Sequence, residues 1–170
     1  YIIKMFAFYK KHNNKLYNKL IELSRDKFFY EKVKLTDDFQ TRILLIFFHL
    51  AIILKKAKGK KYQKKTQSVF DNIFLNIEYH IRELGYGDVA VNKKMKTLSK
   101  IFYDILFNIE KNDNDSFFEI DNLLIKYFFT GDKKNEKLLN LSDYLSKFKN
   151  FCFALDINIM LNGSIDFKYR

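Results

Sequence analysis

The residues of this chain that could do acid–base, nucleophilic or metal chemistry are few and scattered. The three histidines, His12, His49 and His80, lie on different segments without the spacing of a metal site. His49 lies within an apolar run and is expected to be a core histidine. The single cysteine, Cys152, lies in the run KNFCFAL, which favours a buried, unreactive thiol and excludes an internal disulfide. No GxSxG, P-loop, HExxH or CxxC motif occurs. We therefore predict no catalytic residue, no metal site, no cofactor and no enzymatic activity.

The stretch IRELGYGDVAV, residues 81–91, holds two of the five glycines of the chain between two helical sequences. Because it follows a helix and not a strand, its Gly-x-Gly lacks the setting of a phosphate-binding loop. Gly85 is expected just past the helix end, where a positive φ favours a residue without a Cβ atom. Gly87 permits a second bend, and Asp88 or Asn92 is placed to cap the next helix. We interpret the stretch as a rigid elbow between two helices.

The elements that position these residues are expected to be helices. The chain has no proline, few glycines and many Leu, Ile, Lys and Glu residues. Its 170 residues, 48% of them apolar, are enough for one domain with a sizeable core. We predict an all-α fold, a single compact helical domain of about six helices with an irregular C-terminal tail. The expected parts are a leading segment at 1–13, the helical domain at 14–156, and a tail at 157–170 packed on the domain.

Apolar periodicity and capping residues place the individual helices. The stretch SRDKFFYEKVKLTDD, residues 24–38, is expected to be a short helical turn and a connection, and Thr36 or Asp37 within it is expected to cap the helix that follows. Asn162-Gly163 is a weak hairpin signal, but the tail is expected to lie extended on the helices. The other helices are expected to cover about 14–25, 66–84, 92–109, 116–129 and 141–155.

Residues 43–54, ILLIFFHLAIIL, form the most apolar segment. A membrane span needs about 20 apolar residues, and Arg42 and Lys55 bracket this run too closely. The segment is therefore expected to be a central helix, or a helix with one face open to an apolar partner. Asp38, Arg42, His49 and Lys56 recur along it and form its polar edge.

The helix at 66–84 has an apolar face and a line of polar residues beside it. Its line of polar side chains is Gln67, Asp71, Glu78 and Arg82, and such a line usually braces a neighbouring helix. Its apolar face is expected to be buried and consists of Phe70, Ile73, Phe74, Ile77, Ile81 and Leu84.

A net charge of +11 predicts attraction to nucleic acid, ribosomes or acidic lipid. The segment 55–65, KKAKGKKYQKK, is either a solvated surface loop or an anionic docking patch. Arginine is scarce, so sequence-specific recognition of bases is not expected. The lysines of this basic patch are Lys55, Lys56, Lys58, Lys60, Lys61, Lys64 and Lys65.

Two blocks of the sequence carry a family resemblance. The run at residues 81–91 matches the pattern LREhGhGDhxV, in which h is apolar, and Gln67, Phe70, Asp71 and Phe74 match Q-x-x-F-D-x-x-F. An earlier block, SRDKFFYEKVKLTDDFQTRILLIFFHL, also agrees, although Thr41 stands where glycine is usual. Over roughly residues 16–110 the chain resembles the ubiquinol–cytochrome c chaperone family, assembly factors for cytochrome b of the respiratory bc1 complex.

The resemblance implies a non-enzymatic chaperone that binds newly made cytochrome b. It also implies a small helical partner protein, action near the ribosome, and no metal or nucleotide. The basic surface suits contact with the ribosome or an anionic membrane. The expected place is the bacterial cytoplasm or the mitochondrial matrix, at the periphery of the inner membrane. The motif residues, which are candidates for partner binding, are Phe29, Tyr30, Arg42, His49, Asp71, Glu78, Arg82, Glu83, Gly85, Gly87 and Asp88.

A chaperone of this kind needs an exposed apolar groove for its client. Residues 43–54 and 117–129 are the candidates for that surface, and the alternative is that both are core. The alternative function, from another class, is a basic helical RNA- or ribosome-binding protein.

Overall fold

A computed structural model describes residues 14–111, 120–130 and 136–169. The all-α prediction is confirmed, because every regular element in these ranges is a helix. The helices are α1 (Lys15–Ser24), α2 (Lys27–Glu31), α3 (Phe39–Lys56), the 3-10 turn η2 (Lys60–Tyr62), α4 (Gln63–Glu83), α5 (Asp88–Lys111), α6 (Asp121–Phe128), α7 (Glu136–Ala154) and α8 (Ile157–Leu161).

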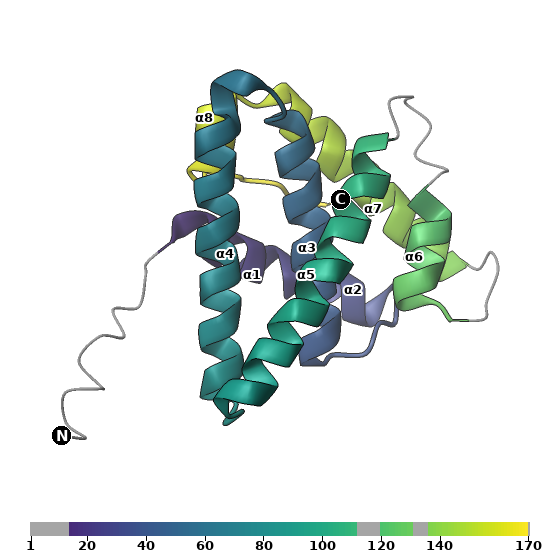
Figure 1. Ribbon diagram of the computed structural model, residues 1–170. Coiled ribbons are helices and arrows are strands. Elements are labelled where there is room, and N and C mark those ends of the chain that lie inside the picture. The colour runs from purple at the N-terminus through teal and green to yellow at the C-terminus, as the bar shows by residue number, and fades with distance from the viewer. Residues whose placement is uncertain (1–13, 112–119, 131–135, 170) are drawn as a thin grey trace.

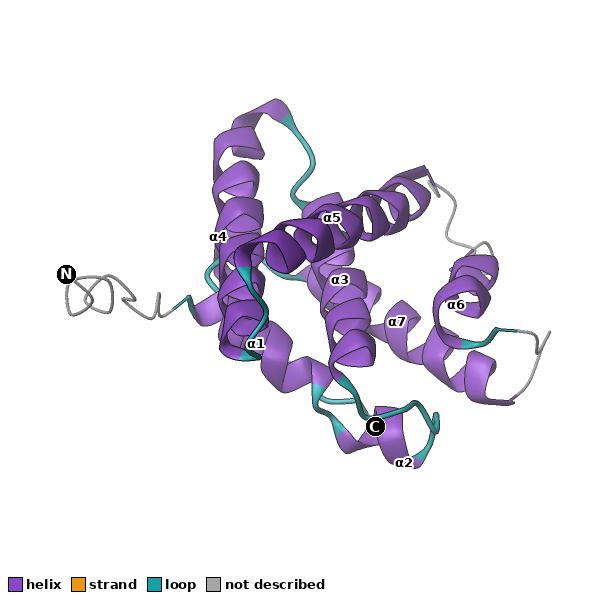
Figure 2. Ribbon diagram, turned by 60° about the horizontal axis from the view of Figure 1, so that its bottom comes forward, coloured by secondary structure: helices purple, strands orange, loops and turns teal. Residues whose placement is uncertain are grey.

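Helix α3 is the centre of the fold. It contacts α1, α5, α7 and α8, so that helices lie on several sides of it (Figures 1 and 2). Every side chain from Ile43 to Leu54 is buried, including the imidazole of His49. A helix that is apolar on all faces is stable in water only when other helices surround it. The interpretation of residues 43–54 as a central helix is thus confirmed, and their use as an open face for a client is wrong.

Short polar side chains begin several of the helices. Asn14 accepts a hydrogen bond from the backbone N–H of Tyr17, and Asp156 accepts from two N–H groups of α8. Asp38 caps α3 by accepting from Thr41 N at 2.8 Å, so the expectation of Thr36 or Asp37 in this role is wrong by one or two residues. Asp37 is available for a different contact, which is described below.

The C-terminal tail differs from the irregular segment expected. It begins with α8, whose five residues are too few to show a helical period in the sequence. Gly163 follows α8 with φ of +80°, so Asn162-Gly163 ends a helix and does not make a hairpin. Beyond it, the ring of Phe167 packs on Tyr144 and Phe148 of α7. The tail therefore contributes aromatic side chains to the core.

Other helix boundaries differ by a few residues from those predicted. α4 begins at Gln63 and α7 by Glu136, both earlier than expected, while the expected start of a helix at 116 lies outside the described residues. Of the second candidate client surface, 117–129, residues 117–119 lie outside the described residues. Ile120, Leu123, Leu124 and Phe129 are buried, and the other described apolar side chains of this range are half-buried, so this range packs largely into the core. In the described ranges, no helix combines the length and apolar content that crossing a bilayer requires.

Candidate functional site

The elbow between α4 and α5 has the geometry that its glycines predict. α4 ends at Glu83, and Gly85 follows with φ of +90°. The backbone N–H of Gly85 donates to the carbonyl oxygen of Arg82 at 2.9 Å, which closes the last turn of α4. Gly87 has no positive φ, and its carbonyl accepts from Val91 N at 2.9 Å to begin α5. The prediction for Gly85 is confirmed, whereas the conformation of Gly87 does not require glycine.

Arg82 connects the two helices across this elbow. Its Nε and Nη2 donate to Oε1 of Glu78 at 3.0 and 2.8 Å, and its Nη1 donates to Oδ1 of Asp88. Hydrogen bonds to Asp88 and Glu78 raise the pKa of the Arg82 guanidinium above its ordinary value. Asp88 is the first residue of α5 and caps nothing there, so the expectation of a capping role is wrong. The planar guanidinium is suited to hold both carboxylates and so to set the angle between α4 and α5.

An apolar cavity of about 410 Å³ lies beside the elbow. It is enclosed by the start of α3, the end of α4 and the first half of α5. Polar side chains at its edge are Gln40, Lys93, Lys94 and Thr97. Its apolar lining consists of Phe39, Ile81, Ala90, Leu98 and Ile101.

Three large apolar side chains are exposed on the elbow segment next to this cavity. Leu84 is 58% exposed, Tyr86 44% and Val89 85%, and all three lie in the chain between the lining residues Ile81 and Ala90. We call the cavity together with these three residues the elbow surface. The expectation that Leu84 is buried is wrong, because α4 ends at Glu83 and the side chain of Leu84 lies just beyond the helix, exposed.

Two motif residues belong to the core and not to this surface. Phe29 and His49 are fully buried, with ring centroids 6.1 Å apart. The ring of Tyr144, on α7, lies 4.6 Å from Phe29 and 5.6 Å from His49. The expectation of a core histidine is confirmed. Its partner Tyr144 was not identified from the sequence, in which nothing links two residues 95 positions apart.

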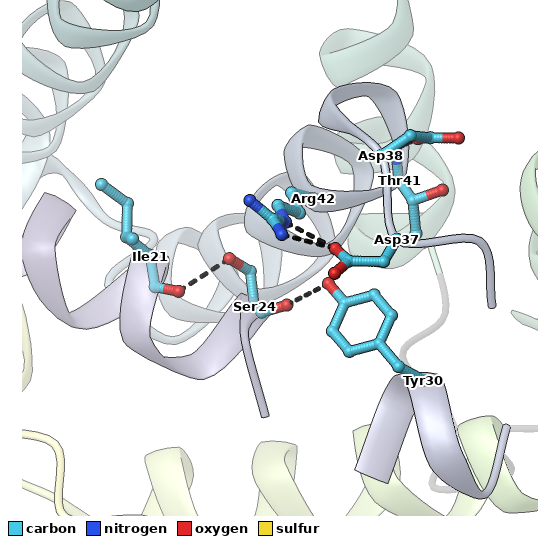
Figure 3. A network of polar contacts seen from close by, with 7 residues as sticks. All are labelled: Ile21, Ser24, Tyr30, Asp37, Asp38, Thr41 and Arg42. Atoms are coloured by element: carbon cyan, nitrogen blue, oxygen red, sulfur yellow. Dashed lines mark hydrogen bonds and ion pairs between the residues drawn. The ribbon is translucent and has the colours of Figure 1, made fainter. Parts of the chain in front are cut away.

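Tyr30 and Arg42 form a second polar cluster where α1, α2 and α3 meet (Figure 3). The Tyr30 hydroxyl donates to the carbonyl of Ser24 at 2.6 Å. Arg42 Nη2 and Nε lie 2.6 and 2.8 Å from Oδ1 of Asp37, and this hydrogen bonding raises the pKa of Arg42. Burial is the main cause that raises the pKa of Tyr30. These contacts hold α2 and the start of α3 against the end of α1.

The remaining motif residues lie on the exposed side of α4. Gln67 Nε2 donates to Asp71 Oδ1 at 2.8 Å within α4, and Glu83 is exposed. Of the predicted line of polar residues, Arg82 makes the bond that reaches the next helix. The expectation that the whole line braces a neighbouring helix is therefore wrong for Gln67 and Asp71.

The lysine-rich segment is divided between structural and exposed side chains. Lys55 Nζ donates to Ile109 O at 2.9 Å, and Lys56 Nζ donates to Phe153 O at 2.8 Å. Both carbonyls lie in the last turn of a helix, where oxygens lack intrahelical partners and attract cations. Lys58 pairs with Glu110 at 3.1 Å, and Lys65 donates to Asn158 Oδ1 at 2.9 Å.

Three lysines of the segment stay available. Lys60, Lys61 and Lys64 are exposed and form no ion pair with another described residue. Lys61 lies over the ring of Tyr62, 5.3 Å from its centroid. The predicted seven-lysine patch is thus a smaller exposed group at η2 and the start of α4.

Neither a metal site nor a reactive thiol emerges within the described ranges. No group of three or more His, Cys, Asp and Glu side chains there could hold a metal ion. Cys152 is buried as expected, and burial raises the pKa of its thiol to about 12. At neutral pH this thiol is protonated, which is the unreactive form.

Comparisons with known proteins agree with the resemblance seen in the sequence. A family model described as ubiquinol-cytochrome C chaperone matches residues 31–167, a range that includes the elbow and most of the tail. The fold is similar to the crystal structure of the Cbp3 homolog from Brucella abortus. The TM-score is 0.77 at 21% sequence identity, and the match covers 99% of this chain and 97% of that chain. At this identity, the likeness shows the fold alone. Among individual curated proteins, none matches the chain.

Proposed function

This chain belongs to the ubiquinol–cytochrome c chaperone family, and we propose that it is a non-enzymatic assembly chaperone of the bc1 complex. In this proposal it binds newly synthesised cytochrome b and keeps that apolar protein available for assembly. The family match over residues 31–167 carries the proposal. The place of action is the periphery of the inner membrane, in the bacterial cytoplasm or the mitochondrial matrix.

The elbow surface is the best supported site for the client. A chaperone of a membrane protein must offer apolar surface that its own core does not use, and the apolar run 43–54 of α3 is completely buried. The cavity of about 410 Å³ is large enough for a few apolar side chains of an extended or helical client. Leu84, Tyr86 and Val89 add apolar contact area at its edge. Lys93 and Lys94 at the same edge keep the free site hydrated.

The family pattern fits this choice of site. Arg82, Glu78 and Asp88 fix the elbow, and Gly85 provides the turn that places Leu84 and Tyr86 outside the core. In this interpretation the charged motif residues position the site, and the apolar positions of the same motif contact the client. Phe29, His49, Tyr30 and Arg42 act only by holding α2 and α3 in place.

Deletion of the gene tests the function. The deletion strain is expected to lose bc1 complex and cytochrome b haem absorbance, while other respiratory complexes stay near their normal amounts. Normal bc1 amounts in this strain would exclude the proposed function.

Complementation of the deletion strain tests the site. Leu84→Ser with Val89→Ser should not restore bc1 amounts, although the variant protein accumulates normally, because both side chains are exposed and contribute little to folding. The matched control is Leu139→Ser with Ile159→Ser, which removes two side chains that are 57% and 48% exposed and lie outside the elbow. Full restoration by the elbow variant would reject this site while leaving the function intact.

The alternative function, binding of RNA or ribosomes, makes a different prediction. It requires direct affinity of the purified protein for RNA that falls steeply as salt concentration rises. Unchanged bc1 amounts in the deletion strain together with such RNA affinity would favour the alternative.

A further inference from the structure

A second cavity, of about 500 Å³, lies at the open end of the α4–α5 hairpin. The two helices meet at the elbow and diverge toward this end (Figure 1). Leu54 and Ala57 at the end of α3 line the cavity, together with Phe70 of α4 and Tyr103 and Leu106 of α5. We call this cavity the hairpin cleft. Its apolar lining comes from three helices, so it is a concave site and not a single helix face.

Exposed aromatic side chains continue the hairpin cleft along α5. Tyr103 is 54% exposed and packs against Phe70 with ring centroids 5.7 Å apart. Phe107, four residues later on the same side of α5, is 65% exposed. Two large exposed aromatic side chains one turn apart, beside a cavity with both apolar and charged lining residues, are typical of a protein-binding surface.

Positive charge surrounds the hairpin cleft. Lys58 and Lys60 line it, and Glu110, the acidic residue in the lining, is already paired with Lys58. Lys64 lies on a shallow depression that shares Gln63 and Gln67 with the cleft.

Further positive charge comes from α5 and from the start of α4. Lys100 is exposed three residues before Tyr103, and neither it nor Lys60 nor Lys64 forms an ion pair with a residue in the described ranges. α4 begins here without a side-chain cap, so its N-terminus adds partial positive charge.

We propose that the hairpin cleft docks an acidic amphipathic segment of a second protein. Apolar anchors of that segment enter between Phe70 and Leu106 and contact Tyr103 and Phe107. Its carboxylates pair with Lys60, Lys64 and Lys100. This site is distinct from the elbow surface, and the inference does not depend on the function proposed above.

The shape of the site favours a protein over the two other anionic partners. A lipid bilayer contacts protruding side chains such as Phe107 but does not fill a hollow, and Leu54, Ala57 and Leu106 line one. Single-stranded nucleic acid stacks its bases on open aromatic faces. Phe70 is instead stacked on Phe74 with centroids 4.3 Å apart and packs against Tyr103 on α5.

The test uses a panel of fluorescent synthetic peptides, each a short helix with glutamates on one side and Leu, Ile or Phe anchors on the other. We expect at least one peptide to bind the full chain, and its variant with every glutamate replaced by glutamine to bind about tenfold more weakly. Lys60→Glu with Lys64→Glu should weaken binding of the acidic peptide by a similar factor. Tyr103→Ala with Phe107→Ala should do so as well, and both pairs are exposed, so the variants are expected to fold.

The control variant is Lys137→Glu with Lys168→Glu, which makes the same change of net charge at exposed positions outside the cleft. It should change the affinity for the peptide less than about twofold. Failure of every peptide to bind, or an equal loss in the control variant, would overturn the proposal.

Parallel titrations use a uridine 30-mer and phosphatidylserine vesicles. The proposal would also be overturned if the RNA or the vesicles bound more tightly than the peptides, and if that binding depended on Lys60 and Lys64 but not on Tyr103 and Phe107.

Discussion

Tyr144 on α7 and His49 on α3 lie in hydrogen-bond contact at the centre of the core, with 2.9 Å between the hydroxyl and Nε2 of the imidazole. Nδ1 of His49 lies 2.7 Å from the carbonyl oxygen of Leu45, which can only accept. Nδ1 therefore carries the hydrogen, and Nε2 accepts from the Tyr144 hydroxyl. This pair satisfies the polar group in the middle of α3 and joins that helix to α7.

Replacement of Tyr144 by Phe should destabilise the protein by about 1–3 kcal/mol, because Nε2 of His49 is then buried without a donor. The free energy of unfolding is measured in urea. The control is Tyr169→Phe, which removes a hydroxyl that donates to Asp143 at 2.6 Å near the surface. Water replaces that contact, so the control should lose about 1 kcal/mol or less. Equal losses in the two variants would contradict the role of the buried pair.

Stability should fall as the pH drops below about 6.5, because of His49. Burial lowers the pKa of His49 from 6.5 to about 4, so the unfolded chain binds a proton that the folded chain resists. The contribution of His49 to the free energy of unfolding is complete above its ordinary pKa. Up to about 3 kcal/mol of that free energy is lost between pH 6.5 and 4.

His49→Gln is the test of this pH dependence. Between pH 6.5 and 4, the free energy of unfolding of the variant should change less than that of the wild type does. This holds whatever the stability of the variant is at pH 7. Two carboxyl groups also titrate at acidic pH. A hydrogen bond from Lys126 is the main cause that lowers the pKa of Asp104, and one from Tyr169 is the main cause for Asp143. Both groups are present in the wild type and in the variant, so their effect on stability is the same in the two proteins. Parallel curves for the wild type and the variant would reject the assignment to His49.

Substitution of the two elbow glycines should have unequal effects. Gly85→Val should cost about 1 kcal/mol or more, because φ of +90° is strained for a residue with a branched Cβ. Gly87→Ala should change stability by less than about 0.5 kcal/mol, because its φ is not positive and no atom lies within 4 Å of the added Cβ. Thermal unfolding compares the two, and the reverse order would show that the elbow has a different conformation.

Gly163→Ala should be more damaging than either elbow variant. An added Cβ would lie 2.6 Å from the backbone nitrogen of Leu16 and 2.7 Å from the carbonyl carbon of Lys15, and φ is +80°. We expect a loss of about 2 kcal/mol or more, since α1 and the tail must separate. Gly59→Ala is the matched control, because φ is +148° there but no atom lies within 4 Å. A similar loss at both glycines would mean that backbone strain, and not contact with α1, sets the cost.

Local signals predicted the elbow well and the surface around it poorly. The helix end at Gly85 follows from one residue and its neighbours, so it was predictable. Leu84 and Val89 continue an apolar pattern, and only the direction of the chain after the helix end decides whether such side chains face the core. The sequence also could not predict which lysines at 55–65 are free. Lys55 and Lys56 donate hydrogen bonds to carbonyl groups of α5 and α7, which are far away in the sequence.

The sequence by itself determined the helical fold, the central place of residues 43–54, the elbow and the family. Each of these depends on periodicity, turn residues or a contiguous motif, which act over a few neighbouring positions. Only the tertiary structure decided that Tyr144 satisfies His49, that Gly163 touches α1, and that apolar surface remains at the elbow and in the hairpin cleft. These relationships join residues from separate helices, and the way helices pack against one another sets which side chains are buried and which stay exposed.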